Sequence, residues 1–148
     1  MATLIEYKKA GLKFERLQEL EAGIELLGHE VKSLRAKQGS LDGSRVVVRG
    51  GEAYIVGMSI PPYQASNVPK GYDPERTRRL LLKKSEIALL ADQDAKKGLT
   101  IVPIEVYTKG RNVKARIAIV RGKNKTDKRE DLKRRDAKRE AERVMKSR

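Results

Sequence analysis

The stretch TIVPIEVYTKGRNVKARIAIV, residues 100–120, predicts the centre of the fold. Two runs rich in β-branched residues flank the turn KGRN, which is the pattern of an antiparallel hairpin. Because successive residues of a strand point to opposite faces, we expect Lys114 and Arg116 on the face opposite the apolar side chains of the second run. Pro103 cannot donate to a strand ladder, so we expect it at a bulge or a sheet edge.

Strand patterns extend outward from this hairpin. The segment SRVVVRGGEAYIV, residues 44–56, predicts a second hairpin, because paired glycines suit the positive φ angles of a tight turn. FERLQEL at 14–20 and IELL at 24–27 are typical of two further short strands. About six short strands favour a mostly β protein built as a small closed antiparallel β-barrel, because closure removes exposed strand edges.

Two helices are expected to flank the strands. HEVKSLRAKQ, residues 29–38, precedes Gly39, and glycine often ends a helix in the left-handed conformation. SEIALLADQDAKK, residues 85–97, has Ser85 as its predicted N-cap and stops at Gly98. Three apolar residues of this second helix are predicted to face the core: Ile87, Leu90 and Ala91.

The charge of the chain predicts a polyanionic partner. The 148 residues carry a formal net charge of +14, and from Lys123 to the end twelve Lys or Arg stand against six Asp or Glu. This end segment has too few large apolar residues to form a core. We therefore expect a β-barrel RNA-binding domain at 1–121 and a basic tail at 122–148 that is disordered when free. Nucleic acid is the expected partner, and an anionic membrane surface is the alternative.

Residue types suited to catalysis are scarce. The chain has no cysteine and a single histidine, His29, so thiolate chemistry, a Ser-His-Asp triad and a histidine-rich metal site are not expected. No glycine-rich GxxxxGK loop occurs. We therefore expect no enzymatic activity and no cofactor. Because the sequence lacks an apolar run of about 20 residues and a signal-peptide core, we expect a cytoplasmic protein.

The segment PPYQASNVPKGYDPERTRR, residues 61–79, has no periodicity and holds four of the five prolines. A long stretch of this kind inside a compact domain is usually functional or disordered. An RNA-binding loop and a solvated loop are the two alternatives. The residues that suit base stacking or phosphate contacts are Tyr63, Lys70, Tyr72, Arg76, Arg78 and Arg79.

EAGIELLGHEVKSLRA, residues 21–36, resembles the signature of the SmpB family, the tmRNA-binding (SsrA-binding) proteins of bacterial ribosome rescue. The resemblance runs in order over residues 14–146. Each motif is short, but their order and spacing together are highly specific. The further segments are GEAYIVGMSIPPY (51–63), DPERTRRLLL (73–82), KGLTIVPIEVY (97–107), VKARIAIVRGK (113–123) and DKREDLKRRDAKREAERVMK (127–146).

The resemblance implies a fold, a partner and a mechanism. Members of this family have an oligonucleotide-binding-type β-barrel with flanking helices, and they bind the tRNA-like part of tmRNA. The pair enters a stalled ribosome, where the protein stands in for the missing anticodon arm and its tail occupies the empty mRNA channel. The implied partners are tmRNA and the ribosome, with no membrane, and the implied state is a monomer that binds one tmRNA.

Candidate tmRNA-binding residues follow from the same resemblance. Glu21 matches a glutamate beside the RNA face, and Leu81 matches a leucine linked to tmRNA binding, although the sequence alone favours core packing for Leu81. Tyr7 stands where the family usually has asparagine, and Thr126 stands where it commonly has Tyr or His. The expected contacts are Tyr7, Lys8, Lys9, Glu21, Lys32, Ser33, Arg35, Leu81 and Lys83.

The tail carries the expected ribosome contacts. Opposite charges at i, i+4 spacing, such as Glu130 with Arg134 and Lys138 with Glu142, favour a helix that is marginal by itself. We expect the tail to become helical on the ribosome, because binding to a polyanionic channel releases counterions. The expected contacts are Gly122, Lys123, Asp127, Lys128, Arg129, Lys133, Arg134, Val144 and Met145.

Two other functions are compatible with the residues. One is a general RNA-binding or ribosomal structural protein with a small β-barrel, which would show no preference for tmRNA. The other is a membrane-surface protein anchored by the tail, which requires a bulky apolar helix face that the tail hardly offers.

Overall fold

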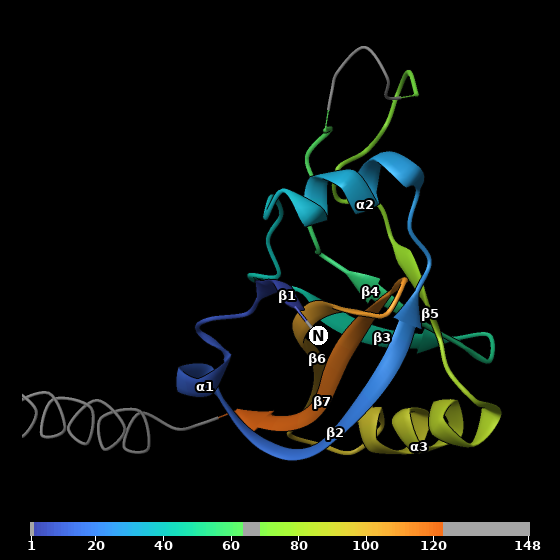
Figure 1. The fold of residues 1–148 in the computed structure, drawn as a ribbon. Coiled ribbons are helices and arrows are strands. Elements are labelled where there is room, and N and C mark those ends of the chain that lie inside the picture. Colours follow the sequence, from blue (N-terminus) through green and yellow to red (C-terminus); the bar gives the residue numbers. More distant parts are fainter. Residues whose placement is uncertain (1, 64–68, 123–148) are drawn as a thin grey trace, which may run out of the picture.

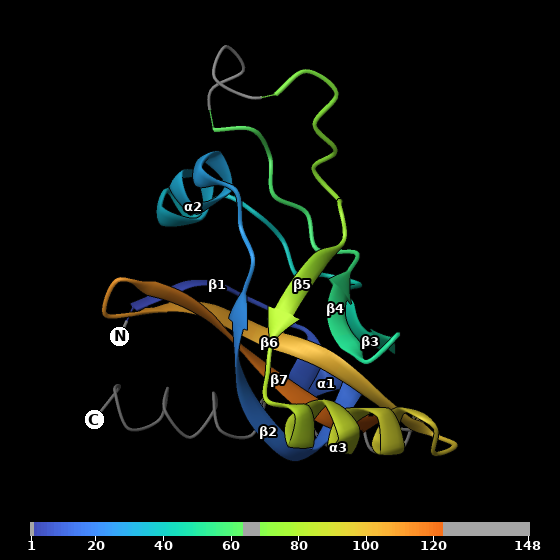
Figure 2. The same cartoon turned by 90° about the vertical axis from the view of Figure 1, so that its right-hand side faces the viewer.

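The computed structural model describes residues 2–63 and 69–122, which form one seven-stranded antiparallel sheet and three helices (Figures 1 and 2). The mostly β class is therefore confirmed. The strand order is β1-β6-β7-β2-β5-β4-β3. The strands are β1 (Ala2–Glu6), β2 (Phe14–Ile24), β3 (Arg45–Arg49), β4 (Glu52–Val56), β5 (Arg78–Leu81), β6 (Leu99–Lys109) and β7 (Asn112–Gly122). The helices are α1 (Ala10–Lys13), α2 (Gly28–Arg35) and α3 (Lys84–Asp94).

Both predicted hairpins are confirmed. β6 and β7 pair along their lengths around the turn at 110–111. Their register shifts between Pro103 and Glu105, so Pro103 lies at a bulge, as expected for a residue without a backbone N–H. β3 and β4 meet at Gly50 and Gly51, whose φ angles of +58° and +76° are the left-handed values that a tight hairpin turn needs.

The second half of β7 lies in the centre of the core. Residues 117–120 are all buried, so the predicted alternation of buried and exposed residues holds only at the start of the strand. There Lys114 and Arg116 are partly exposed and Ala115 between them is buried. β7 therefore presents polar side chains to solvent only near its two ends.

The described sheet has two edge strands, β1 and β3, so the predicted closed barrel is not found. The sheet curls far enough for β3 to contact β6, yet the two strands do not pair (Figure 2). β1, a strand that the sequence patterns did not predict, pairs with residues 105–108 of β6 on the side away from β7 and so forms one edge of the sheet. The sheet stays open because β1 and β3, its two edge strands, do not pair with each other.

Helix α3 begins differently from the prediction. It starts at Lys84, so Ser85 lies inside the first turn and is not the N-cap. Lys83 is the N-cap, and its backbone N–H donates to Oε1 of Glu86 at 3.0 Å. A carboxylate at the third helical position can satisfy the N-terminal N–H groups by reaching back, so a serine cap is not required.

Burial corrects two further expectations. Ile87 and Leu90 of α3 are buried as predicted, whereas Ala91 is exposed and lines an open hollow. β2 ends at Ile24, so residues 25–27 do not form a separate strand; they lead into α2. Apolar residues therefore continue past the end of β2 and past the buried face of α3, which is why the sequence pattern overestimated both.

A buried ion cluster joins α2 to β5 and the segment before it; the Glu30 cluster comprises Glu30, Tyr72, Arg76 and Arg78. Glu30 and Arg78 are fully buried. Oε2 of Glu30 accepts hydrogen bonds from Nε of Arg78 (2.9 Å), Nε of Arg76 (3.0 Å) and the Tyr72 hydroxyl (2.8 Å). Burial acts to raise the pKa of Glu30, but hydrogen bonds from Arg76, the Leu27 N–H, Arg78 and Tyr72 outweigh it and lower the pKa to about 2.

The Glu30 cluster changes the interpretation of residues 61–79. Three of the candidate RNA-contact residues in this segment belong to the cluster, so they are engaged within the protein. Arg79 pairs with Glu25 at 2.7 Å. Tyr63 and Lys70 are the exposed candidates that remain in the described part of the segment. The sequence left an RNA-binding loop and a solvated loop as alternatives for this segment, whereas most of these candidate side chains make contacts within the protein.

Candidate nucleic-acid interface

Leu81 is 49% exposed, which makes it the most exposed large apolar side chain in the described part of the chain. The preceding residue, Leu80, is fully buried, and strand alternation turns Leu81 outward. Leu81 pairs with Gly23 of β2, where an added Cβ would lie only 3.1 Å from the Cβ of Leu81. The core packing that the sequence favoured for Leu81 was therefore wrong.

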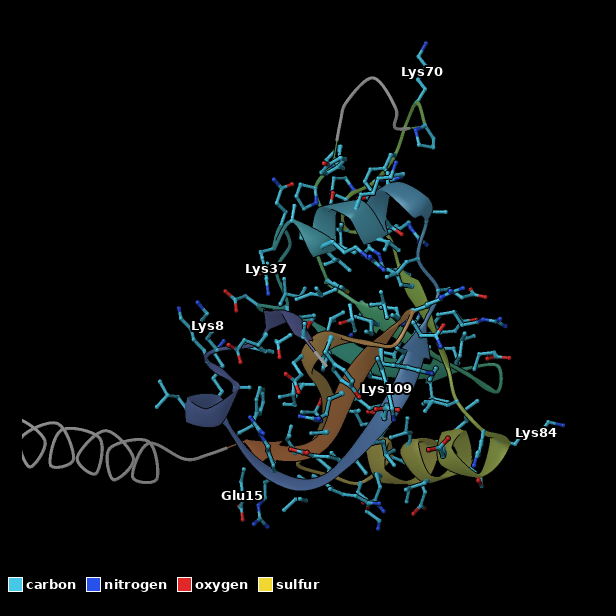
Figure 3. All side chains as sticks on the ribbon, in the orientation of Figure 1. Lys8, Glu15, Lys37, Lys70, Lys84 and Lys109 are labelled. Atoms are coloured by element: carbon cyan, nitrogen blue, oxygen red, sulfur yellow. The ribbon has the colours of Figure 1, made fainter. Side chains whose placement is uncertain are left out.

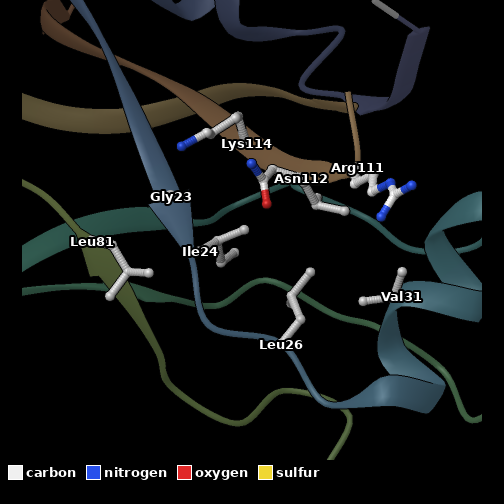
Figure 4. A pocket seen from close by; sticks show the side chains of 9 residues that line it. Gly23, Ile24, Leu26, Val31, Leu81, Arg111, Asn112 and Lys114 are labelled. Atoms are coloured by element: carbon white, nitrogen blue, oxygen red, sulfur yellow. The ribbon is translucent and has the colours of Figure 1, made fainter. Parts of the chain in front are cut away.

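Two hollows open on either side of Leu81. The first hollow has a volume of about 290 Å³ and lies between β2, α2, β5 and the β6–β7 turn (Figure 4). It is lined by Gly23, Ile24, Leu26, Val31, Leu81, Arg111, Asn112, Val113 and Lys114. The second hollow has a volume of about 420 Å³ and is lined by Glu21, Gly23, Glu52, Arg79, Leu80, Leu81, Leu82, Lys83, Glu86 and Lys114. Leu81 and Lys114 line both hollows.

Glu21 contributes a fixed negative charge to the second hollow. Its carboxylate accepts a hydrogen bond from the hydroxyl of Tyr107 and pairs with Nζ of Lys109 at 3.1 Å. The Tyr107 hydrogen bond, followed by that of Lys109, lowers the pKa of this exposed carboxyl. Burial, followed by the hydrogen bond to Glu21, raises the pKa of Tyr107 to about 12. Glu21 is therefore ionised at neutral pH and is held in one orientation.

Unpaired cations line the two hollows and the exposed surface of α2. Several basic side chains of the sheet are neutralised: Lys109 by Glu21, and Arg116 by Glu105. Five others form no ion pair with any described residue, which leaves them available for phosphate groups. These five are Lys32, Lys83, Arg111 and Lys114, together with Arg35 of α2.

The predicted residues of α2 and α3 have different environments. Lys32 and Arg35 are exposed, in agreement with a role in RNA binding. Ser33 is fully buried and donates its hydroxyl hydrogen to the carbonyl oxygen of Pro61 at 2.7 Å, so its side chain supports the fold. Lys83 is exposed and lines the second hollow with Glu21. The structure therefore brings Glu21, Leu81 and Lys83 together, and it removes the Ser33 side chain from the accessible surface.

The N-terminal candidates lie apart from Leu81. The Tyr7 side chain is only 5% exposed, and its hydroxyl oxygen accepts a hydrogen bond from the Gly43 N–H at 3.3 Å. A direct RNA contact through this side chain was therefore a wrong prediction, because its ring and hydroxyl are used in the core. Lys8 and Lys9 are exposed, and Lys8 lines a separate hollow of about 370 Å³ (Figure 3).

The predicted ribosome contacts fall almost entirely outside the described residues. Gly122 is described, and it ends β7 opposite Phe14 of β2. It therefore belongs to the sheet and not to the tail. The remaining tail candidates lie outside the described residues: Lys123, Asp127, Lys128, Arg129, Lys133, Arg134, Val144 and Met145.

The β6–β7 turn contributes three side chains that were not predicted as site residues: Arg111, Asn112 and Lys114. In the sequence, the polar and basic residues at the end of the most apolar hairpin could have indicated a binding site. Their position beside Leu81 could not be predicted, because it depends on the register between strands. Within residues 2–63 and 69–122, no group of three or more His, Cys, Asp or Glu side chains is placed to hold a metal ion. None of the helices described is long and apolar enough to cross a membrane.

Known proteins resemble this chain over nearly its whole length. Residues 4–147 match the model of the SmpB protein family. The SsrA-binding protein of Microcystis aeruginosa is 46% identical over 143 residues, covering 97% of this chain and 93% of that protein. The SsrA-binding protein of Oleidesulfovibrio alaskensis is 47% identical over 144 residues, with coverage of 97% and 92%.

A solved structure extends the likeness to three dimensions. It is described as "tmRNA-SmpB: a journey to the center of the bacterial ribosome". The matching chain is 37% identical and superposes with a TM-score of 0.70, covering 88% of this chain and 95% of that chain. The overall fold therefore has a counterpart in a solved structure.

Proposed function

The chain belongs to the SmpB family, and from this membership we infer that it binds tmRNA and delivers it to stalled ribosomes in trans-translation. The observation that carries this conclusion is the match to the family over residues 4–147, nearly the whole chain. The function is one of binding, without catalysis. Because its proposed partners are tmRNA and ribosomes, we also propose a cytoplasmic location and a monomer that binds one tmRNA.

The geometry supports the surface around Leu81 as the tmRNA-binding face. An exposed leucine, an ionised Glu21 and unpaired cations gather there. Phosphate contacts supply most of the affinity for nucleic acid, whereas apolar and hydrogen-bonding groups supply specificity. The surface offers both kinds of group. A negative charge beside cations also disfavours binding of phosphate backbone at random, because the Glu21 carboxylate repels phosphate oxygens.

We propose a division of labour between the two parts of the chain. The sheet and its helices bind the tRNA-like part of tmRNA and stand in for the anticodon arm. The tail, from Lys123 onward, occupies the empty mRNA channel and becomes helical there. The tail's excess of basic residues supports this proposal, since ribosomal RNA is a polyanion.

Competition binding tests the proposed function against a general RNA-binding role. Labelled tmRNA is bound to the full chain at physiological salt, and unlabelled tmRNA or an unrelated structured RNA of equal length is added. We expect tmRNA to compete at a concentration at least about 10³-fold lower than the unrelated RNA, the lower end of typical specificity ratios. Equal competition by both RNAs would instead favour a ribosomal or general RNA-binding protein.

Removal of the tail should leave specific tmRNA binding largely intact. Truncation after Gly122 keeps all of β7 and all of the surface around Leu81. We expect the affinity to fall by no more than about tenfold at physiological salt, because the basic tail adds mainly salt-dependent, non-specific attraction. The measurement is a salt titration of tmRNA binding, which should also show a shallower slope. Loss of all specific binding in the folded truncated chain would contradict the division of labour.

Arg35→Ala should weaken tmRNA binding without destabilising the protein. Arg35 is exposed on α2 and has no ion-pair partner among the described residues. Its loss should cost less than about 0.5 kcal/mol of folding free energy. It should also reduce the slope of log affinity against log salt by about 1, as expected for one lost phosphate contact.

Arg49→Ala is the matched control for this measurement. Arg49 is also exposed and ends the edge strand β3, which contributes no residue to either hollow. Arg35, in contrast, lies on α2, which contributes Val31 to the first hollow. It removes the same charge, so long-range attraction falls equally in both variants. Binding that weakens as much in Arg49→Ala as in Arg35→Ala would show that net charge, and not the position of Arg35, determines the affinity.

A further inference from the structure

The first hollow combines an aliphatic floor with a polar rim. Its volume of about 290 Å³ is at the lower end of the roughly 300–1,000 Å³ of small-molecule pockets. Ile24, Leu26 and Val31 form the floor, and Leu81 stands at one side (Figure 4). A site of this size and composition suits one flat ring system, with an apolar face to cover and polar groups at its edge.

From this arrangement, we infer that the first hollow binds a single unstacked nucleobase of the RNA partner. The inference rests on the proposed function and specifies what part of the RNA this site takes. Proteins read RNA sequence mainly at loops, bulges and ends, where bases can leave the stack. An aliphatic floor removes the face of such a base from water, whereas a paired base in a helix has both faces already covered.

Asn112 provides the group that contacts the edge of the base. Figure 4 shows its side chain between those of Lys114 and Arg111, directed toward the middle of the hollow. Its side-chain amide has no hydrogen-bond partner among the described residues, so its donor and acceptor are both available. A carboxamide pairs in bidentate fashion with N6 and N7 of adenine. This pairing favours an adenine as the bound base.

Two cations match the phosphates on either side of that nucleotide. Arg111 and Lys114 lie on opposite sides of Asn112, and neither forms an ion pair with a described residue (Figure 4). A nucleotide within a chain carries one phosphate on its 5′ side and one on its 3′ side. An acidic peptide would also be attracted to these cations, but its Asp and Glu side chains have no flat apolar face to cover the floor.

Chemical footprinting of the tRNA-like part of tmRNA tests this site. Diethyl pyrocarbonate reports the accessibility of N7 of adenine, on the edge that Asn112 contacts. Dimethyl sulfate and a carbodiimide together report the Watson–Crick edges of all four bases, with and without the full-length protein. Asn112→Ala removes the edge contact at an exposed turn position. Val31→Phe fills the hollow. Val48→Phe is the matched control, because Val48 is likewise partly buried but lines an open hollow beside α3.

We expect the wild-type protein to protect one unpaired adenine. In Asn112→Ala and Val31→Phe that adenine should become reactive again, and the affinity should fall by roughly five- to tenfold, in line with the loss of one bidentate base contact. Val48→Phe should keep both the protection and the affinity. Thermal melting shows whether each variant is folded. If Val31→Phe does not fold, the result for Asn112→Ala alone tests the base site.

The outcomes separate this inference from the proposed function. If Asn112→Ala binds tmRNA with unchanged affinity and an unchanged footprint, the base site is wrong and the proposed function stands. The base site is equally wrong, and the proposed function again stands, if the protein protects only the RNA backbone and no base. If the wild-type protein shows no preference for tmRNA, the proposed function fails and the base site fails with it.

Discussion

Glu30→Ala is expected to lower the free energy of unfolding by about 3–5 kcal/mol, because it leaves the guanidinium of Arg78 buried without a counter-charge. Arg78 is fully buried, and its Nη2 lies 2.6 Å from Oε2 of Glu30. The Tyr72 hydroxyl and Arg76 lose their acceptor at the same time. Urea denaturation followed by circular dichroism measures the loss as a lower midpoint at an unchanged m value.

Glu25→Ala is the control for the loss of a carboxylate paired with arginine. Glu25 pairs with Arg79 at 2.7 Å, but both side chains are largely exposed. An exposed pair of this kind contributes about 0–1 kcal/mol. A loss of similar size in Glu25→Ala and Glu30→Ala would show that burial of the Glu30 cluster does not determine its contribution.

The same cluster predicts a dependence of stability on acid. The pKa of Glu30 is lowered from 4.5 to about 2, so the folded protein favours the ionised carboxylate. Its contribution is fully present above pH 4.5 and is lost as the pH falls toward 2. The difference in urea midpoint between wild type and Glu30→Ala should therefore shrink over this pH window. A difference that stays constant down to pH 2 would mean that Glu30 is not ionised in the folded protein.

Lys138→Pro is expected to abolish tagging on stalled ribosomes and to leave tmRNA binding unchanged. Lys138 lies outside the described residues, and this expectation follows from the proposed tail helix. Opposite charges at i, i+4 spacing around it favour that helix, and an interior proline costs it about 3 kcal/mol. The measurement is incorporation of the tmRNA-encoded tag in a reconstituted translation system with a message that lacks a stop codon.

Lys138→Ala separates the loss of the helix from the loss of a charge. Alanine removes the same ammonium group but favours the helix, so this variant should retain most of its tagging activity. If Lys138→Pro tags at the wild-type level, no continuous helix is needed and the proposed state of the tail is wrong. If both variants fail equally, the charge at this position is responsible.

Local patterns predicted those parts of the fold that depend on neighbouring residues. The Gly50–Gly51 turn and the bulge at Pro103 each follow from backbone constraints within a few residues, and both are confirmed. β5 was missed because its first residue is an arginine, a residue type rarely buried in a strand. Its burial depends on Glu30, which lies 48 positions away in the sequence.

The candidate site was predicted in part, mainly through the family resemblance. That resemblance selected Glu21, Arg35 and Leu81, which are all exposed, and it also selected Tyr7, whose side chain lies in the core. The exposure of Leu81 depends on the register that pairs β5 with Gly23, and no local pattern contains that register. The sequence predicted the β6–β7 turn. It did not predict the first hollow, because the other residues that line this hollow belong to elements distant in the sequence.

The Glu30 cluster has a consequence for the thermodynamics of RNA binding. Glu30 precedes Val31 on α2, and Arg78 begins the strand that carries Leu81, so the ion pair connects the element that carries part of the floor to the element that carries the Leu81 side of the first hollow. The ion pair holds these two elements together before any ligand arrives. RNA binding therefore does not cost the conformational entropy of ordering these two elements, and a larger part of the free energy of the RNA contacts appears as affinity.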